Sequence, residues 1–106
     1  MTRTMETGRY RLDLCQRGQW EPTHSFHNSP EEAVGGEVRF LRGWCKEAAM
    51  PEPDKVADTL MEESLAVYDT ELRRFAILGG FVLRSGGPVL KLMDLRSGLV
   101  REEAIA

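Results

Sequence analysis

The sequence predicts a single α+β domain: an N-terminal β-hairpin, a long helix, a short second helix and a C-terminal antiparallel β-meander, with the helices packed on one face of the sheet. Apolar and polar residues alternate near the N-terminus, a helix-start signal precedes a long apolar stripe, and strand–turn–strand patterns follow near the C-terminus. We expect residues 9–103 to form the domain, with a flexible tail at 1–8 and a second tail at 104–106.

The N-terminal hairpin is predicted from a period-two pattern that starts at Tyr10 and continues through Leu12 and Leu14. The large side chains of the following strand, Trp20 and Phe26, also have even numbers. A three-residue loop over residues 16–18 would place all these side chains on the core face, since it pairs Leu14 with Trp20. We therefore predict that register.

The long helix is predicted to begin at Ser29-Pro30-Glu31-Glu32, where serine caps the helix, proline fits its first turn and Glu32 completes a capping box. We expect the helix to run to about Ala49, because apolar residues follow at spacings of four and three. These residues are Val34, Val38, Leu41, Cys45 and Ala48.

Prolines at 51 and 53 end that helix, and the apolar pattern predicts a short second helix from near Pro53 or Asp54. Residues 65–78 then become strand-like around an Asp69-Thr70 turn signal. A helix that continues to Leu78 is the alternative, because single-sequence patterns leave both open here.

The C-terminal meander is predicted from two turn signals, Ser85–Pro88 and Ser97-Gly98. Pairing Arg84 with Val89 across the first turn gives one apolar face and one half-exposed face. The apolar face contains Phe81, Leu83, Leu90 and Leu92. The second turn is predicted to set Asp94 opposite Arg101 as an oppositely charged cross-strand pair.

Composition argues against several classes of function. The chain of 106 residues has a net charge of −3, which gives no electrostatic reason to expect nucleic acid or a membrane surface as partner. The longest apolar run, residues 75–83, is too short to span a membrane, and the N-terminus lacks a signal-peptide pattern. We expect no membrane partner and a cytoplasmic location.

Cys15, Cys45, His24 and His27 are the candidate groups for metal or thiol chemistry. Strand periodicity puts Cys15 on the outer face and Cys45 on the core side of the helix, so we expect two free thiols. We expect no metal, no cofactor and no catalytic residue, because the two histidines have opposite parity on a strand and no group is placed to orient a base. A small thiol enzyme that uses Cys45 or Cys15 with His24 is kept as an alternative.

The long helix carries the candidate binding residues. Glu37 falls inside the apolar sector of the helix, beside Phe40 and Trp44. One interpretation is that these three residues form the rim of a partner-binding surface. The other is that they belong to an ordinary core, in which Glu37 pairs with Arg11 or Arg73. For the two aromatic residues, the core is the simpler interpretation.

The opposite side of the helix carries Arg39, Arg42 and Lys46, which we call the basic stripe. The sequence therefore predicts a non-catalytic protein–protein interaction module: an adaptor, inhibitor, immunity-type protein or accessory subunit. Its partner is another protein or a second copy, in a homodimer through a sheet edge or the helix rim. A nucleic-acid-associated protein that uses the basic stripe is a disfavoured alternative.

Overall fold

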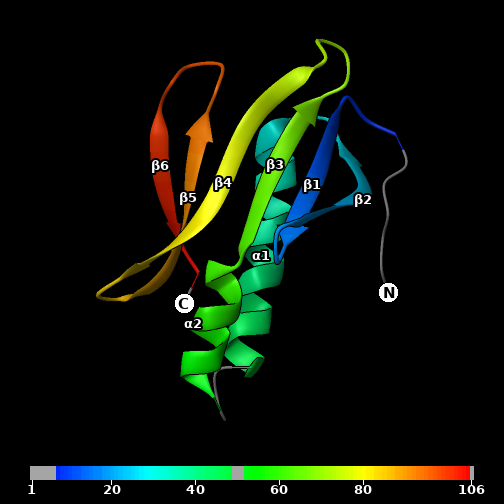
Figure 1. The fold of residues 1–106 in the computed structure, drawn as a ribbon. Coiled ribbons are helices and arrows are strands. Elements are labelled where there is room, and N and C mark those ends of the chain that lie inside the picture. The colour runs from blue at the N-terminus through cyan, green and yellow to red at the C-terminus, as the bar shows by residue number, and fades with distance from the viewer. Residues whose placement is uncertain (1–6, 49–51, 106) are drawn as a thin grey trace.

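The structure is a computed structural model that describes residues 7–48 and 52–105, with the side chains of residues 22–24 outside the description. Six strands form one antiparallel sheet in the order β2-β1-β3-β4-β5-β6, and two helices connect β2 to β3 (Figure 1). The elements are β1 (Tyr10–Gln16), β2 (Gln19–His27), α1 (Pro30–Ala48), α2 (Pro53–Met61), β3 (Glu63–Asp69), β4 (Arg74–Arg84), β5 (Gly87–Asp94) and β6 (Val100–Ala104).

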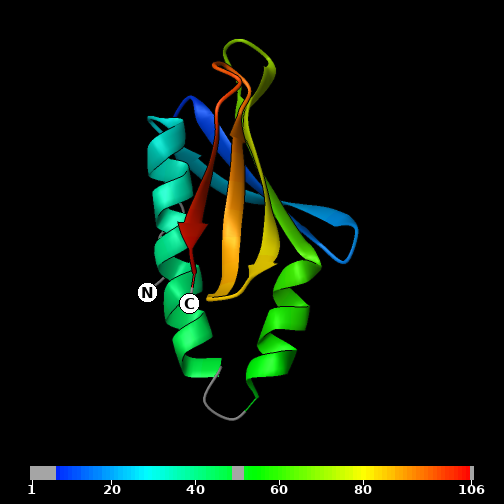
Figure 2. The same ribbon diagram turned by 90° about the vertical axis from the view of Figure 1, so that its left-hand side faces the viewer.

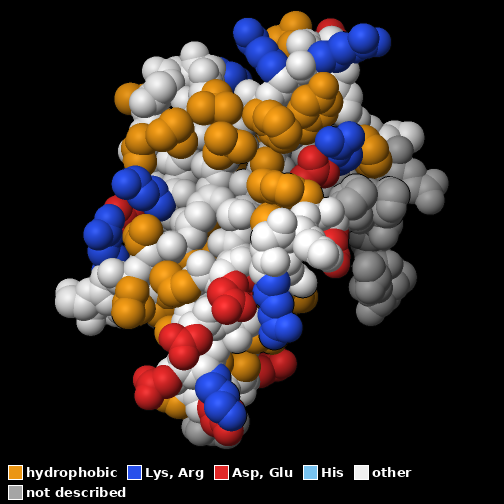
Figure 3. All heavy atoms as spheres, in the orientation of Figure 1, with side chains coloured by type: hydrophobic (Ala, Val, Ile, Leu, Met, Phe, Trp, Pro, Cys, Tyr) orange, Lys and Arg blue, Asp and Glu red, His pale blue; other side chains and the backbone are white. Residues whose placement is uncertain are grey.

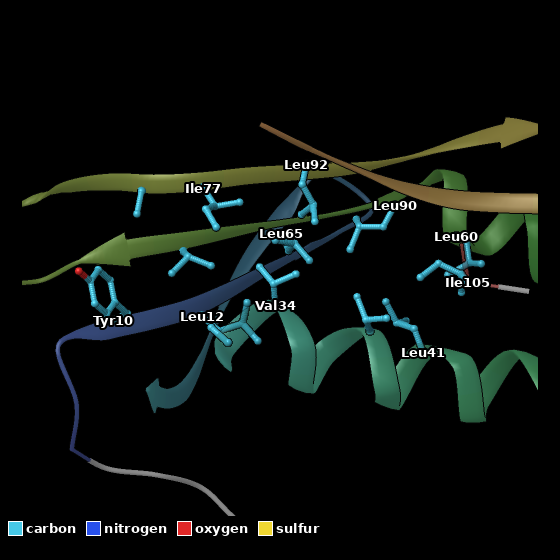
Figure 4. Close-up of a cluster of buried hydrophobic side chains, with 14 of the residues drawn as sticks. Tyr10, Leu12, Val34, Leu41, Leu60, Leu65, Ile77, Leu90, Leu92 and Ile105 are labelled. Carbon is cyan, nitrogen blue, oxygen red and sulfur yellow. The ribbon is translucent and has the colours of Figure 1, made fainter. Parts of the chain in front are cut away.

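The helices pack against the sheet, which confirms the predicted fold class. Figure 2 shows α1 along one face of the sheet and α2 at one end of it. The core lies between α1 and this face, which we call the inner face. Side chains from both helices and from the strands meet there (Figure 4). The fully buried residues with the largest side chains are Leu60, Leu65, Leu90, Leu92, Val34 and Val67.

The N-terminal hairpin has a different register from the predicted one. Gln16 pairs with Gln19 and Cys15 with Trp20. The turn therefore has two residues, Arg17 and Gly18, with φ of 53° and 80°. Two positive φ values are typical of a turn whose twist matches that of the flanking strands. The predicted three-residue loop is wrong, and Trp20 lies on the outer face of the sheet, 54% exposed.

The second predicted core aromatic of this hairpin, Phe26, also lies on the outer face. The β1–β2 register shifts between Leu12, which pairs with Ser25, and Asp13, which pairs with Pro22. This bulge leaves the alternation of faces unchanged, so Phe26 stands opposite Arg11.

The predicted start of α1 is confirmed. The Ser29 hydroxyl accepts a hydrogen bond from the Glu32 amide at 3.1 Å, and the Glu32 carboxylate accepts one from the Asn28 amide at 3.1 Å. The predicted end at Ala49 lies outside the described residues. The short second helix is confirmed as α2, and the helical alternative for residues 65–78 is wrong, because β3 and β4 occupy this segment.

The meander has the predicted faces and a different register. Arg84 pairs with Gly87 and Val82 with Val89, so the pairing of Arg84 with Val89 is wrong by two positions. A shift of two residues preserves the face of every side chain. The predicted Asp94–Arg101 pair is also wrong: Arg101 stands opposite Leu92, and Asp94 accepts hydrogen bonds from the Arg96 guanidinium.

The last described residues belong to the domain. Ala104 lies in β6 and Ile105 is only 3% exposed. Figure 4 shows Ile105 between Leu60 of α2 and Leu41 of α1. Ala104 and Ile105, assigned from the sequence to a C-terminal tail, are thus part of the fold, because Ile105 completes the core. Residues 1–6 and 106 of the predicted tails lie outside the described residues.

Candidate functional site

A groove of about 350 Å³ runs between α1 and the β1–β2 hairpin. Its floor and walls come from the inner face of the hairpin and from one side of α1. Gly36 lies on this side of the helix, and the absence of a side chain there widens the groove. The lining residues are Leu12, Leu14, Ser25, His27, Ala33, Gly36, Glu37 and Phe40.

The two candidate aromatic residues of α1 have different environments. Phe40 is 65% exposed at the edge of the groove, whereas Trp44 is half-buried and packs against the core. The expectation that both aromatic residues belong to the core is therefore wrong for Phe40. An exposed phenylalanine beside an apolar groove is typical of a residue that becomes buried when a partner protein binds and then contributes much of the binding energy.

Glu37 lines the groove, and no Lys, Arg or His side chain of the described residues forms an ion pair with its carboxyl group. Burial raises its pKa to about 7, and the Glu63 carboxylate adds to the shift. Neither arginine proposed as its partner from the sequence pairs with it within the described chain: Arg11 binds Asp13, with 2.7 Å between Nε and Oδ1, and no ion pair joins Arg73 to Glu37. Glu37 therefore titrates near neutral pH.

Ser25 and His27 add a polar edge to the groove that sequence reasoning missed. The Ser25 hydroxyl and the His27 Nε2 atom form a hydrogen bond. Burial lowers the pKa of His27, and the Glu32 carboxylate opposes this shift. Both residues are visible in the sequence, but they lie on the inner face because the Arg17-Gly18 turn has two residues, which is not the predicted register.

The basic stripe is partly engaged within the fold. The Arg42 guanidinium donates a hydrogen bond to the Ala104 carbonyl at 2.9 Å and lies 3.7 Å from the Glu103 carboxylate. Arg39 and Lys46 are exposed. Arg42 thus connects α1 to the end of β6. Because its charge is partly neutralised by Glu103, the basic stripe presents less positive charge to a partner.

The two cysteines are free thiols on opposite sides of the sheet. Cys45 is buried in the core, where burial and the Glu63 carboxylate raise the pKa of its thiol. A raised pKa is the reverse of what activates a thiol nucleophile. Cys15 is buried on the outer face, and the side chain of His24 lies outside the described part of the chain. Among the described residues, no group of three or more His, Cys, Asp or Glu side chains lies close enough together to bind a metal ion.

Comparisons with models of protein families, with curated proteins and with solved structures found no match to this chain. Among the described residues, neither helix has the length and apolar character needed to cross a bilayer.

Proposed function

We propose that the chain is a non-catalytic protein–protein interaction module that docks its partner in the groove between α1 and the β1–β2 hairpin. The observation that carries this proposal is the exposure of Phe40, 65%, at the edge of an apolar groove. Aromatic residues at such positions supply much of the binding energy of interfaces, because a partner desolvates them completely.

The charge of the groove indicates the chemistry of the partner. Glu37 has no cation of its own among the described residues, its pKa is raised to about 7, and the whole chain has a net charge of −3. A lysine or arginine placed beside Glu37 would favour its ionised form and offset the cost of burying it. The partner is thus a polypeptide segment that offers an apolar side chain to Phe40 and a cation to Glu37.

An adaptor, an inhibitor, an immunity-type protein or an accessory subunit would each use such a surface. The partner is another protein or a second copy of the chain, and the edge strand β2 beside the groove has backbone groups available for strand addition. Two free thiols support a reducing compartment such as the cytoplasm.

The test is capture of a partner by the immobilised chain, followed by titration calorimetry with the purified partner. Phe40→Ala should lower the affinity at least about tenfold, because it removes the anchor. Leu83→Ala is the matched control, since Leu83 is similarly exposed at the far end of β4, and it should bind as the wild type does. Equal affinity of Phe40→Ala and the wild type would refute the groove as the docking site.

The dependence of the affinity on pH tests the role of Glu37. Ionised Glu37 binds a cation, and below its pKa of about 7 it is increasingly protonated. The affinity should therefore fall as the pH decreases from about 8 to about 6, by at most about tenfold per pH unit. In Glu37→Gln this dependence should disappear. A pH profile that is the same in both proteins would show that the partner does not contact Glu37.

A further inference from the structure

The outer face of the sheet, opposite α1, is left uncovered by the described residues and carries exposed apolar side chains. A row of cross-strand partners crosses this face from β1 to β6, so the side chains in the row point to the same side of the sheet. The row is Asp13, Ala66, Leu78, Met93 and Val100. Figure 3 shows apolar side chains gathered over this face, above the charged residues around α2. The large apolar residues here, each at least 39% exposed, are Trp20, Phe75, Leu78, Met93 and Val100.

The middle of this face is hollow. The next row of cross-strand partners runs from Trp20 through Cys15, Ser64 and Gly80 to Lys91. Gly80 has no side chain, and a Cβ atom added there would meet nothing within 4 Å. A hollow of about 300 Å³ results, with Leu78, Met93 and Val100 in its lining. The face therefore combines protruding side chains with a cavity that accepts one.

Most charged groups of this face are paired with one another. The Arg84 guanidinium donates hydrogen bonds to Glu102, with 3.1 Å between Nε and Oε1, and Arg11 is held by Asp13. The face therefore lacks the acidic excess that gives the chain its net charge of −3. A second copy that brings the same face meets no acid–acid repulsion there.

The apolar area of the face is large enough to contribute a substantial part of a dimer interface. A whole aromatic side chain has about 150–250 Å², so the exposed fractions of the five apolar residues sum to several hundred Å². An interface of standard size buries about 800 Å² on each partner. The polar residues around the hollow, Arg84, Lys91 and Glu102, supply the rim that usually surrounds such a patch.

We propose that two copies of the chain associate through this outer face, sheet against sheet about a two-fold axis, with a side chain of each copy entering the hollow over Gly80 of the other. An isologous contact of this kind needs a face that is complementary to itself, and protrusions beside a hollow meet that need. The groove beside Phe40 stays free in this arrangement.

The test is the molar mass by light scattering over a concentration series, which should approach twice the 12.0 kDa of one chain. Gly80→Leu should raise the dissociation constant at least about tenfold, because it fills the hollow. Met93→Lys should do the same, because it buries a charge in the interface. Circular dichroism checks the fold of each variant, and Met93→Lys alters a residue that is already exposed in the monomer.

Two controls locate the contact. Gly43→Leu adds the same side chain on α1, where a Cβ atom also meets nothing within 4 Å, and it should leave the dimer intact. Phe40→Ala should leave it intact as well, whereas loss of the dimer in Phe40→Ala would place the contact at the helix instead. A monomeric wild type at every concentration, or a dimer that Gly80→Leu and Met93→Lys do not weaken, would overturn the proposal.

Discussion

Glu37 links the stability of the fold to pH. Its pKa is about 7 in the folded protein and returns to about 4.5, the ordinary value, when the chain unfolds. Between these two values the folded state binds a proton that the unfolded state lacks. The free energy of unfolding therefore decreases as the pH rises from about 4.5 to about 7.

Replacing Glu37 with glutamine should remove this dependence. At pH values above 7 the variant should be more stable than the wild type by on the order of 3 kcal/mol, because the ionised carboxyl no longer has to be buried. Below about pH 4.5 the two proteins should have similar stability. Urea denaturation over this pH range measures the difference. Glu47→Gln on the exposed side of the same helix is the control, and a constant difference between the Glu37→Gln and wild-type curves would contradict the prediction.

A helical projection of the sequence is enough to single out Glu37, Phe40 and Trp44 as unusual residues of α1. It does not separate the exposed Phe40 from the half-buried Trp44, because that difference depends on the tertiary packing around α1. The missing cation is likewise a tertiary property: Arg11 is on the outer face, held by Asp13, and not on the groove side.

Strand β4 contains two adjacent glycines whose surroundings differ. On the inner face, a Cβ atom at Gly79 would lie 2.9 Å from Leu92 Cδ2 and 3.1 Å from Leu65 Cδ1. On the outer face, a Cβ atom at Gly80 would meet nothing within 4 Å. The inner face thus requires glycine for close packing, and the outer face does not.

Gly79→Ala should destabilise the protein by about 1–3 kcal/mol, because the leucines must move to make room for the methyl group. Gly80→Ala is the matched control and should leave stability unchanged or raise it slightly, since alanine restricts the unfolded chain. Denaturation midpoints of the two variants provide the comparison. Equal losses in both would mean that backbone conformation, and not packing against Leu65 and Leu92, decides the effect.

Local signals predicted the elements better than their registers. The capping residues at Ser29 and the periodic stripe of α1 are properties of the chain itself, and both were confirmed. The predicted register of the N-terminal hairpin is wrong because it rests on burial of Trp20 and Phe26, and the structure places both on the outer face. The turns at Arg17-Gly18 and Ser85-Gly86 fix the observed registers instead, and Trp20 is exposed as a consequence.

Across the whole molecule, the core joins segments from both ends of the described chain. Tyr10 on β1 and Ile105 after β6 belong to one cluster of buried side chains. The Ile105 amide also donates a hydrogen bond to the Pro88 carbonyl at 3.2 Å, which continues the ladder between β5 and β6. Ile105 therefore stabilises the contact between the sheet and both helices.

Ile105→Ala should lower the free energy of unfolding by about 2–5 kcal/mol, as for other large-to-small changes in a packed core. Leu99→Ala is the control: Leu99 is 73% exposed, and its truncation should change stability by less than about 0.5 kcal/mol. Thermal and chemical denaturation measure both. Similar effects of the two substitutions would show that Ile105 contributes no more than a surface residue.

The position of Ile105 also affects when the core is completed during synthesis. Strand β1 is made before β3, with which it pairs, but the space between Leu41 and Leu60 is filled only once residue 105 has left the ribosome. Up to that moment the nascent chain exposes apolar surface from helices and strands alike. The core therefore closes only after every element of the sheet has been synthesised.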